Sequence, residues 1–351
     1  MKLFFSFVVV AVVFVLSCKP KRDYVPRALA EVETELILRD STLSIRAIEI
    51  LDKNSLAFAA NHNRFGLYSE KDKKWIISKQ EYDSLAIEFR AVAGNIQDFF
   101  MLSVGSPALL FKTGNSGAME LVYTESHEKT FYDAIRFWNE KEGIAIGDPT
   151  ERCMSIIVTR DGGETWKKIP CNQLPEARDG EAAFAASNSN IAMVGNHTWV
   201  ATGGKVSRIL YSADKGYTWE IYETPIIQGL ETTGIFAVDF YDELNGFAIG
   251  GDYTQPDDNS ANKIVTHDGG KTWHLVAENQ EPGYRSCVQY IPGTKGKELV
   301  AIGFKGIDFS NDGGYTWKHL SNEGFYTLRF VNDTIAYAAG KGRIAKLTFR
   351  E

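Results

Sequence analysis

Five arginines lie near the starts of predicted strands, where their guanidinium groups could bind a carboxylate or another anion. They are Arg46, Arg90 and Arg285 at the strand starts, with Arg136 and Arg329 slightly further along. Arginine is permanently charged, and its planar set of donors matches a carboxylate. In an acidic chain such a cluster predicts an anion-binding site. The alternative is that each arginine pairs with a neighbouring acid, such as Asp133 or Asp239, and only joins strands.

Loops of variable length, predicted between the second and third strands of a repeated unit, carry the other candidate binding residues. They are Asp148 in residues 147–152, His197 and Trp199 in residues 195–199, and Asp252 in residues 251–263. Binding residues concentrate on variable loops above a rigid scaffold. A lone loop histidine such as His197 could equally be incidental.

The longest of these loops also holds a group of carboxylates. Asp252, Asp257 and Asp258 together could ligate Ca²⁺, which prefers oxygen ligands. A solvated acidic loop explains the same residues, and we adopt that interpretation. The sequence therefore predicts no cofactor and no metal site, with Ca²⁺ as the alternative.

Four further aspartates belong to an octapeptide that recurs in residues 159–166, 212–219, 266–273 and 310–317 with the pattern Ser/Thr-x-Asp-x-Gly-x-Thr-Trp. Such an aspartate can accept hydrogen bonds from backbone N–H groups, the glycine can adopt a positive φ, and the tryptophan can bury its ring beneath the turn. We therefore predict a structural hairpin turn in each copy and no catalytic group. The residues with this role are Asp161, Trp166, Asp214, Trp219, Asp268, Trp273, Asp312 and Trp317.

The elements around the octapeptide repeat as well. A short apolar run ending in glycine precedes each copy, at residues 143–147, 191–195, 246–250 and 299–303. In most units an earlier strand ends in an aromatic residue. Four antiparallel strands in about 40–50 residues form one blade of a β-propeller. Weaker copies in residues 44–77 and 89–123, and three final strands in residues 327–349, bring the prediction to an all-β, seven-bladed propeller.

The last unit lacks an outer strand, and the N-terminal part of the chain offers one. The apolar residues 34–38, around Leu36, are predicted to pair beside residues 344–349. Such closure removes an open sheet edge and locks the ring. The alternative is a tether that extends to Ser41.

Cysteine positions suggest one disulfide. Cys153 and Cys171 are placed symmetrically about Gly162, the centre of a predicted hairpin, so their Cα atoms could lie within disulfide reach. The alternative is two buried thiols. Cys287 is then left as a buried, small apolar residue.

The chain opens with Met1-Lys2, an apolar run to Leu16, and Ser17-Cys18, which is typical of a secretory signal. Residues 15–18 resemble the lipobox of bacterial lipoproteins, which implies cleavage before Cys18 and a lipid on its thiol. The alternative is an ordinary signal peptide with an incidental cysteine. The predicted organisation is a signal peptide at 1–17, a tether at 18–33 and a propeller at 34–351. Because no acidic cluster follows Cys18, we expect a periplasm-facing lipid anchor.

The octapeptide is identified as the Asp box, or bacterial neuraminidase repeat (BNR), of a group of propellers. That group includes sialidases, sortilin-like receptors, and the assembly and stability factors of photosystem II. The starts of the first two units, at residues 46–48 (Arg-Ala-Ile) and 90–92 (Arg-Ala-Val), are most similar to the photosystem-factor family. This resemblance implies a non-catalytic binding and assembly platform.

Two enzymatic alternatives follow from relatives of this kind. A sialidase-like glycoside hydrolase needs three arginines, a tyrosine nucleophile helped by a glutamate, and an aspartic acid. The Arg-Ile-Pro motif of such enzymes is absent, because Ala47 follows Arg46. The second alternative is an oxidoreductase-labelled relative, but the chain has no Gly-x-Gly-x-x-Gly motif between strand and helix, no paired redox cysteines and no haem motif.

Composition narrows the partners. The net charge is −7 with 24% charged residues, which fits a globular protein and gives no sign of nucleic-acid binding. We therefore expect a monomeric cell-envelope lipoprotein that binds a protein or glycan without catalysis.

Overall fold

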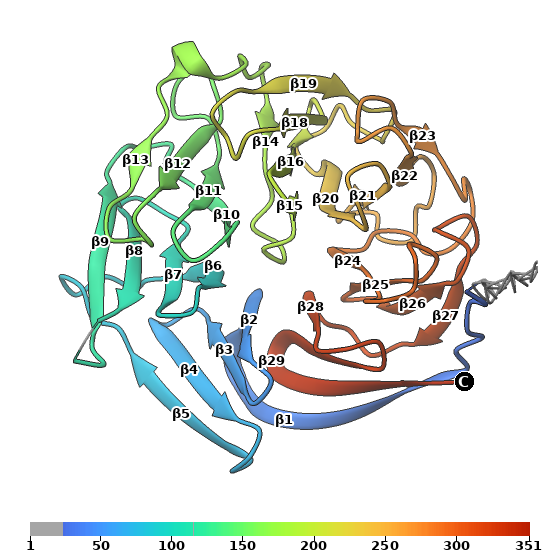
Figure 1. Ribbon diagram of the computed structural model, residues 1–351, viewed down its shortest axis with the longest axis horizontal. Coiled ribbons are helices and arrows are strands. Elements are labelled where there is room, and N and C mark those ends of the chain that lie inside the picture. Colours follow the sequence, from blue (N-terminus) through green and yellow to red (C-terminus); the bar gives the residue numbers. More distant parts are fainter. Residues whose placement is uncertain (1–23, 115) are drawn as a thin grey trace, which may run out of the picture.

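The repeated units form seven radial sheets around one axis, as Figure 1 shows. The computed structural model describes residues 24–114 and 116–351. The signal peptide predicted at residues 1–17 and the predicted lipidation site, Cys18, lie outside these residues. Within the described chain, no helix is long and apolar enough to cross a membrane.

The first six blades each contain four antiparallel strands, ordered from the axis outward. Blade 1 contains β2 (Ala47–Asp52), β3 (Ser55–Ala59), β4 (Arg64–Ser69) and β5 (Lys74–Lys79). Blade 2 contains β6 (Phe89–Gly94), β7 (Phe99–Ser103), β8 (Ala108–Thr113) and β9 (Met119–Glu125). Blade 3 contains β10 (Tyr132–Phe137), β11 (Gly143–Gly147), β12 (Ser155–Thr159) and β13 (Lys167–Lys168). Blade 4 contains β15 (Ile191–Val194), β16 (His197–Ala201), β18 (Arg208–Ser212) and β19 (Glu220–Glu223). Blade 5 contains β20 (Thr233–Phe240), β21 (Gly246–Asp252), β22 (Lys263–Thr266) and β23 (His274–Leu275). Blade 6 contains β24 (Cys287–Tyr290), β25 (Leu299–Gly303), β26 (Gly306–Ser310) and β27 (Lys318–Ser321). Two short strands, β14 (Glu181–Ala182) and β17 (Gly203–Gly204), extend the sheet of blade 5 beyond β20.

The seventh blade closes the ring with both ends of the chain. It contains β28 (Thr327–Phe330), β29 (Ile335–Arg350) and β1 (Glu31–Ser44), and β1 forms its outer edge (Figure 1). The Phe349 N–H donates to the Thr334 carbonyl at 2.9 Å, so β29 folds back on itself and supplies two of the four strands. Leu36 pairs with Ala345, and Val32 pairs with Phe349. The predicted N-terminal closure is confirmed, although β1 is longer than residues 34–38.

The four Asp boxes have one geometry, shown by the copy at residues 159–166. The Asp161 carboxylate accepts the Thr165 N–H at 2.9 Å and the Thr165 hydroxyl at 2.6 Å. The Thr159 hydroxyl accepts the Gly163 N–H at 2.9 Å, and the Trp166 indole donates to the Gly163 carbonyl at 3.2 Å. All four copies repeat this pattern. Each aspartate is therefore saturated by its own turn, as predicted.

The blades adhere through apolar side chains that pack between neighbouring sheets. Between blades 2 and 3, Phe137 and Trp166 pack on Phe100 with ring centroids 4.7 and 6.2 Å from it. Between blades 4 and 5, Trp199 stacks on Phe240 at 3.6 Å, and its indole donates to the Gly269 carbonyl at 2.8 Å. Buried aromatic rings contribute the largest apolar areas to such interfaces.

Blade 4 corrects the predicted register of one unit. The apolar run Ile191–Val194 is the inner strand β15, and His197 and Trp199 lie in the second strand, β16. The prediction placed these two residues in a loop between the second and third strands, which is wrong. Gly195 and Asn196 instead form a two-residue hairpin turn, with Val194 paired to His197 and Gly195 at φ 58°. Because β16 is neither wholly apolar nor ended by glycine, its sequence did not resemble the other second strands.

A disulfide joins Cys153 to Cys171, with Cα atoms 5.5 Å apart. Cys171 begins a single 3-10 turn, Cys171–Gln173, that leads away from blade 3. Cys287 is free and buried.

The residues before β1 form a strap over blade 6. The Arg27 side chain donates to the fully buried Glu298 carboxylate at 2.6 and 2.9 Å, and the Arg27 N–H adds a third bond at 2.8 Å. Leu29 is buried in the apolar cluster shared by blades 6 and 7. The strap therefore joins the N-terminal segment to the closing blade by burial and by charge.

Removing Arg27 tests the strap. Arg27→Ala leaves the Glu298 carboxylate buried without its cation, so we expect a loss of about 3 kcal/mol in the free energy of unfolding. Arg350→Ala is the matched control, because it breaks the exposed Arg350–Glu33 pair of the same closure and should change stability little. Urea unfolding of both variants measures the difference, and equal stabilities would contradict the role of the strap.

Candidate functional site at the channel mouth

Within residues 24–114 and 116–351, one segment of the chain crosses the central channel. Residues 183–190 lie between β14 and β15 and run towards the axis, where Figure 1 shows the loop between these strands reaching the middle of the ring. Asn188 donates to the Val92 carbonyl of blade 2 at 2.7 Å and accepts the Ile135 N–H of blade 3 at 2.9 Å. We call residues 183–190 the plug.

The opposite side of the channel holds the plug as firmly. The Ser187 hydroxyl donates to the Ser286 carbonyl at 2.6 Å, and the Ser189 carbonyl accepts the Val238 N–H at 2.9 Å. The Arg329 guanidinium donates to the carbonyls of Ser187 and Asn188 at 3.3 and 2.9 Å. The plug therefore bonds to the inner strands of blades 2, 3, 5, 6 and 7, and the backbone groups that would otherwise face the channel gain partners.

Above the plug lies an open bowl of about 530 Å³. The plug supplies its floor, where Phe184 stacks on Phe236 with ring centroids 3.8 Å apart. Tyr284 meets Phe236 edge-on at 4.8 Å. The lining residues are Arg46, Arg90, Phe131, Ala183, Phe184, Ala185, Ala186, Phe236, Tyr253, Tyr284, Phe304 and Tyr326. The bowl thus combines two cations with a wall of aromatic rings.

β-Bulges aim several side chains at this level. The pairing of inner and second strands skips one residue between Phe89 and Ala91, and again between Ile235 and Ala237. The skipped residues are Arg90 and Phe236, both of which line the bowl. A bulge re-aims a side chain without ending the sheet. A third bulge, between Tyr132 and Ala134, places Asp133 at the equivalent position of blade 3.

Arg46 is the least satisfied cation of the bowl. Its Nε is buried and has no hydrogen-bond partner among the described residues, and its guanidinium lies over the Tyr326 ring at 4.4 Å. Burial and the nearby charge of Arg90 lower the pKa of Arg46. Arg90 itself is held by Glu88 at 2.7 Å. An incoming carboxylate could satisfy the unpaired donor and offset the repulsion between the two arginines.

The other three predicted arginines lie outside the bowl. Arg285 is buried and donates to Asp308 at 2.6 Å, so it joins strands, as the alternative interpretation held. Arg329 holds the plug. Arg136 lies on β10 below the plug, where burial and the nearby charge of Arg329 lower its pKa and the charges of Glu49 and Asp239 oppose that shift. The five arginines therefore divide among the bowl, the plug and the lower channel.

The predicted loop residues also have structural partners. Asp148 accepts the Ala183 N–H at 2.7 Å and so positions the start of the plug. Trp199 is fully buried, and the His197 ring bonds to the Tyr211 hydroxyl at 2.5 Å. Asp252 accepts the N–H and hydroxyl of Thr254. None of these four side chains lines the bowl, although Tyr253, next to Asp252, does.

The aspartates of the long loop do not converge on a common point. Asp258 bonds to Ser260, and Asp257 pairs with Lys305 at 2.9 Å. Among residues 24–114 and 116–351, no group of three or more His, Cys, Asp or Glu side chains is placed to hold a metal ion.

A tyrosine and a glutamate do meet elsewhere. Tyr132 donates to Glu125 at 2.8 Å, and Lys168 also contacts this carboxylate. Tyr132 is fully buried, and neither Tyr132 nor Glu125 lines the bowl. The pair therefore lies outside the bowl that contains Arg46 and Arg90, and it does not complete a sialidase-type set there.

Sequence reasoning found the cations of the bowl and missed its aromatic wall. Phe236 and Tyr326 occupy the positions of their inner strands equivalent to Arg46 and Arg90, as the strand pairings show. Aligning the residues just before each inner strand would have revealed them. Phe184 gave no such signal, because it belongs to the plug and not to a repeated unit.

Comparisons with known proteins agree with this architecture. Residues 264–275 match the family model for the BNR/Asp-box repeat, and no curated protein matches the sequence. The solved structure described as YCF48 bound to D1 peptide is similar, with 13% sequence identity, a TM-score of 0.67, and coverage of 92% of this chain and 98% of that chain. The RRP9 WD40 repeats are similar at 11% identity and a TM-score of 0.63, over 93% of this chain and 100% of that one. The chain is an Asp-box repeat β-propeller with the fold of these proteins.

Because the buried Asp148 holds the start of the plug, we predict that the stability of the protein depends on pH. Burial raises the pKa of Asp148 to about 6, and burial with the nearby Asp148 charge raises the pKa of Asp133. An aspartate in the unfolded chain has a pKa of about 3.9, so the unfolded state loses its proton first and stability falls as pH rises from about 4 to about 6. Asp148→Asn keeps the acceptor for Ala183 and cannot ionise. We expect it to be more stable than the wild type by about 2 kcal/mol at pH 7.5 and equal to it near pH 4.

The measurement is thermal or urea unfolding at both pH values. Asp179→Asn is the control, because the fully exposed Asp179 lies near the same loop and should leave both values unchanged. A variant that is less stable than the wild type at pH 7.5 would contradict the buried-carboxylate argument.

Proposed function

We propose that this propeller is a non-catalytic binding protein that holds a segment of a protein partner in the bowl. The observation that carries the proposal is the buried, unpaired Nε of Arg46 beside Arg90, within a wall of aromatic rings. Leaving a buried donor without a partner costs stability, and a bound acceptor removes that cost. Aromatic and arginine side chains are also the residue types that dominate protein–protein binding energy.

The rigidity of the bowl supports binding over catalysis. Its floor is fixed by hydrogen bonds from the plug to five blades, so little ordering is required when a ligand arrives. The similar propeller YCF48 is described as bound to a D1 peptide. From that protein we extend to this chain only the mode of binding, in which a propeller holds a peptide.

An acidic glycan is the second candidate, because two arginines and several aromatic rings also suit an anionic sugar. A hydrolase would need an acid and a nucleophile within reach of the bound sugar. The Tyr132–Glu125 pair is not in the bowl. The two candidates differ in turnover and in partner, so one experiment separates them.

A photo-crosslinking amino acid at Tyr253 tests the peptide proposal. Tyr253 lies on the rim and is 46% exposed, so the substitution should not disturb the fold. We expect a saturable crosslink to one envelope protein that falls at least tenfold when Arg46→Gln and Arg90→Gln are combined. Arg178→Gln, at an exposed pair with Glu223, is the control and should leave the crosslink unchanged.

A panel of fluorogenic sialosides is measured with the same variants. Turnover that disappears with Arg46→Gln would defeat the binding proposal and favour the hydrolase. A crosslink that persists in the double variant would remove the bowl as the site.

We further propose that the chain is anchored to the cell envelope by a lipid on Cys18 and faces the periplasm. The apolar run to Leu16 and the residues 15–18 support this placement. Tyr24, which contacts Glu298 on the propeller, follows Cys18 by only six residues. Six residues span at most about 20 Å, so the strap would hold the propeller close to the membrane.

Metabolic labelling tests the anchor. Labelled palmitate should enter the wild type and be lost in Cys18→Ala, because the thiol is the acceptor. Cys287→Ala is the control and should keep the label. Equal labelling of wild type and Cys18→Ala would refute the lipid anchor.

A further inference from the structure

The interface between blades 1 and 2 lacks the tryptophan that packs in its counterparts. In blades 3 to 6 the tryptophan of each Asp box packs towards the preceding blade, as Trp166 does on Phe100. The equivalent position of blade 2 is Glu120, which is exposed. Gly94 also ends the paired part of the inner strand in blade 2, where Phe137 does so in blade 3. The aromatic packing that closes the interface between blades 2 and 3 is therefore missing here.

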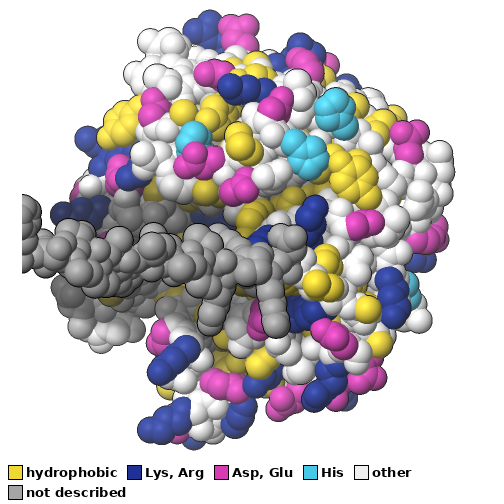
Figure 2. Space-filling view, turned by 45° about the vertical axis from the view of Figure 1, so that its right-hand side comes forward, with side chains coloured by type: hydrophobic (Ala, Val, Ile, Leu, Met, Phe, Trp, Pro, Cys, Tyr) yellow, Lys and Arg dark blue, Asp and Glu magenta, His cyan; other side chains and the backbone are white. Residues whose placement is uncertain are grey.

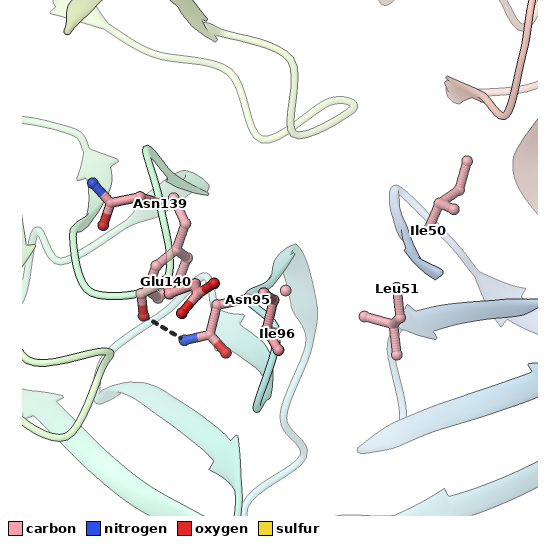
Figure 3. Close-up of a pocket in the computed structure, with 8 residues that line it drawn as sticks. Ile50, Leu51, Asn95, Ile96, Asn139 and Glu140 are labelled. Carbon is pink, nitrogen blue, oxygen red and sulfur yellow. Dashed lines mark hydrogen bonds between the residues drawn. The ribbon is translucent and has the colours of Figure 1, made fainter. Parts of the chain in front are cut away.

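A cavity of about 310 Å³ lies at the inner end of this interface. Leu51 packs directly over Gly94, where any Cβ would lie 2.8 Å from a Leu51 methyl group. Both residues line the cavity with Ile50 and Ile96, and Figure 3 shows the two side chains of blade 1 across an opening from Asn95 and Ile96. One leucine thus takes the place of an aromatic ring and leaves a hollow beside it.

The outer end of the same interface leaves apolar side chains exposed. Leu67 of β4 pairs with Ile76 of β5, on the face of blade 1 from which Phe65 packs against blade 2. On the facing side of blade 2, Leu121 of β9 pairs with Phe111, which packs against blade 1. Leu67, Ile76 and Leu121 are 42%, 67% and 39% exposed. Both blades therefore present aliphatic surface to water at the rim, where Figure 1 shows β5 and β9 as the outermost strands.

β5 also has a regular backbone edge without a partner strand in the described chain. It pairs with β4 through six consecutive residues without a register shift, whereas shifts interrupt β9 and β27, β13 and β23 have two residues each, and β1 carries three glutamates. The Gln80 N–H donates inward to the Asn63 carbonyl at 2.9 Å. Because backbone direction alternates along a strand, Trp75, Ile77 and Lys79 point their N–H and C=O groups outward. Such an edge can pair with a further strand.

The charges at the two ends of β5 indicate which strand would fit. Lys74 and Lys79 are exposed, and within residues 24–114 and 116–351 the only ion pair of either is the exposed contact of Lys79 with Glu81. A second copy of β5, antiparallel and in full register, would place Lys74 opposite Lys79 at both ends. Like charges directly opposite one another are destabilising. A strand with acidic ends is attracted at both ends instead, although each exposed pair contributes little.

We propose that β5 is a docking edge for an extended segment of another protein that is apolar in its centre and acidic at both ends. The segment adds to blade 1 as a fifth strand and bonds to the outward groups of Trp75, Ile77 and Lys79. In this mode of recognition main-chain hydrogen bonds provide affinity, and alternate side chains provide specificity. Its apolar side chains on the face towards blade 2 lie beside Ile76 and Leu121 and remove apolar surface from water. The edge lies on the rim and is independent of the bowl.

Fluorescence anisotropy of a labelled peptide, Glu-Glu-Val-Thr-Val-Thr-Glu-Glu, tests the edge on the full-length chain in detergent. We expect saturable binding, and at least tenfold weaker binding of the same peptide with lysine in place of every glutamate. The combined variant Lys74→Glu and Lys79→Glu should reverse that preference. Arg90→Gln in the bowl is the control and should leave both affinities unchanged, which separates this edge from the peptide site proposed in the bowl.

A proline tests the backbone edge itself. Ile77→Pro removes an outward N–H and keeps the bonds to β4, so the fold should persist while the acidic peptide binds at least tenfold more weakly. Ile77→Val is the matched control and should keep the wild-type affinity. If Ile77→Pro unfolds, the charge-reversal variant remains decisive, because both of its lysines are exposed.

Four results would overturn the proposal. They are no saturable binding at millimolar peptide, equal affinity of the wild type for the acidic and the basic peptide, unchanged affinity in a folded Ile77→Pro variant, and an unchanged preference in the charge-reversal variant. Light scattering that shows a wild-type dimer, dissociated by Ile77→Pro, would assign the edge to a second copy of this chain and would also overturn it.

Discussion

The inner strands of a closed ring present their backbone edges to the channel, and the molecule is arranged around satisfying them. A buried N–H or C=O without a partner costs about as much as a lost hydrogen bond. The plug answers this constraint in several blades at once, through Asn188 on one side and Ser187 and Ser189 on the other. Because the plug crosses the channel, it also separates the bowl from the lower channel.

The outer face of the molecule is built from more regular parts. Each Asp box forms its turn with hydrogen bonds among its own residues, so the neighbouring strands need only provide a packing site for the tryptophan ring. Acidic and basic side chains are interspersed over the surface that Figure 2 shows, as is typical of a surface in contact with water. Specific chemistry is therefore concentrated along the axis, where the blades converge and water is restricted.

The sequence predicted the repeated parts well and the unique parts poorly, for a physical reason. Asp161 and its three equivalents recur because each turn solves the same local problem, and Leu36 could be placed because the last blade lacked a strand. The strand positions of blade 4 were predicted wrongly because Trp199 lies in a second strand that is not apolar throughout. The plug has no counterpart in other blades, so neither periodicity nor repeat could reveal where Phe184 lies.

The same reasoning separates arginines that hold the fold from those that are free to bind. Arg285 pairs with the buried Asp308, and Arg329 donates to buried backbone carbonyls, so both side chains serve the fold. Arg46 retains a buried donor without a partner, and Arg136 forms no ion pair with a described residue, although both lie where charge is costly to maintain. A sequence shows only that an arginine stands near a strand start. Whether it is satisfied depends on which acceptor the fold brings to it. For Arg329 these acceptors are carbonyls of the distant plug, and for Arg285 the acceptor is Asp308 on another strand of the same blade.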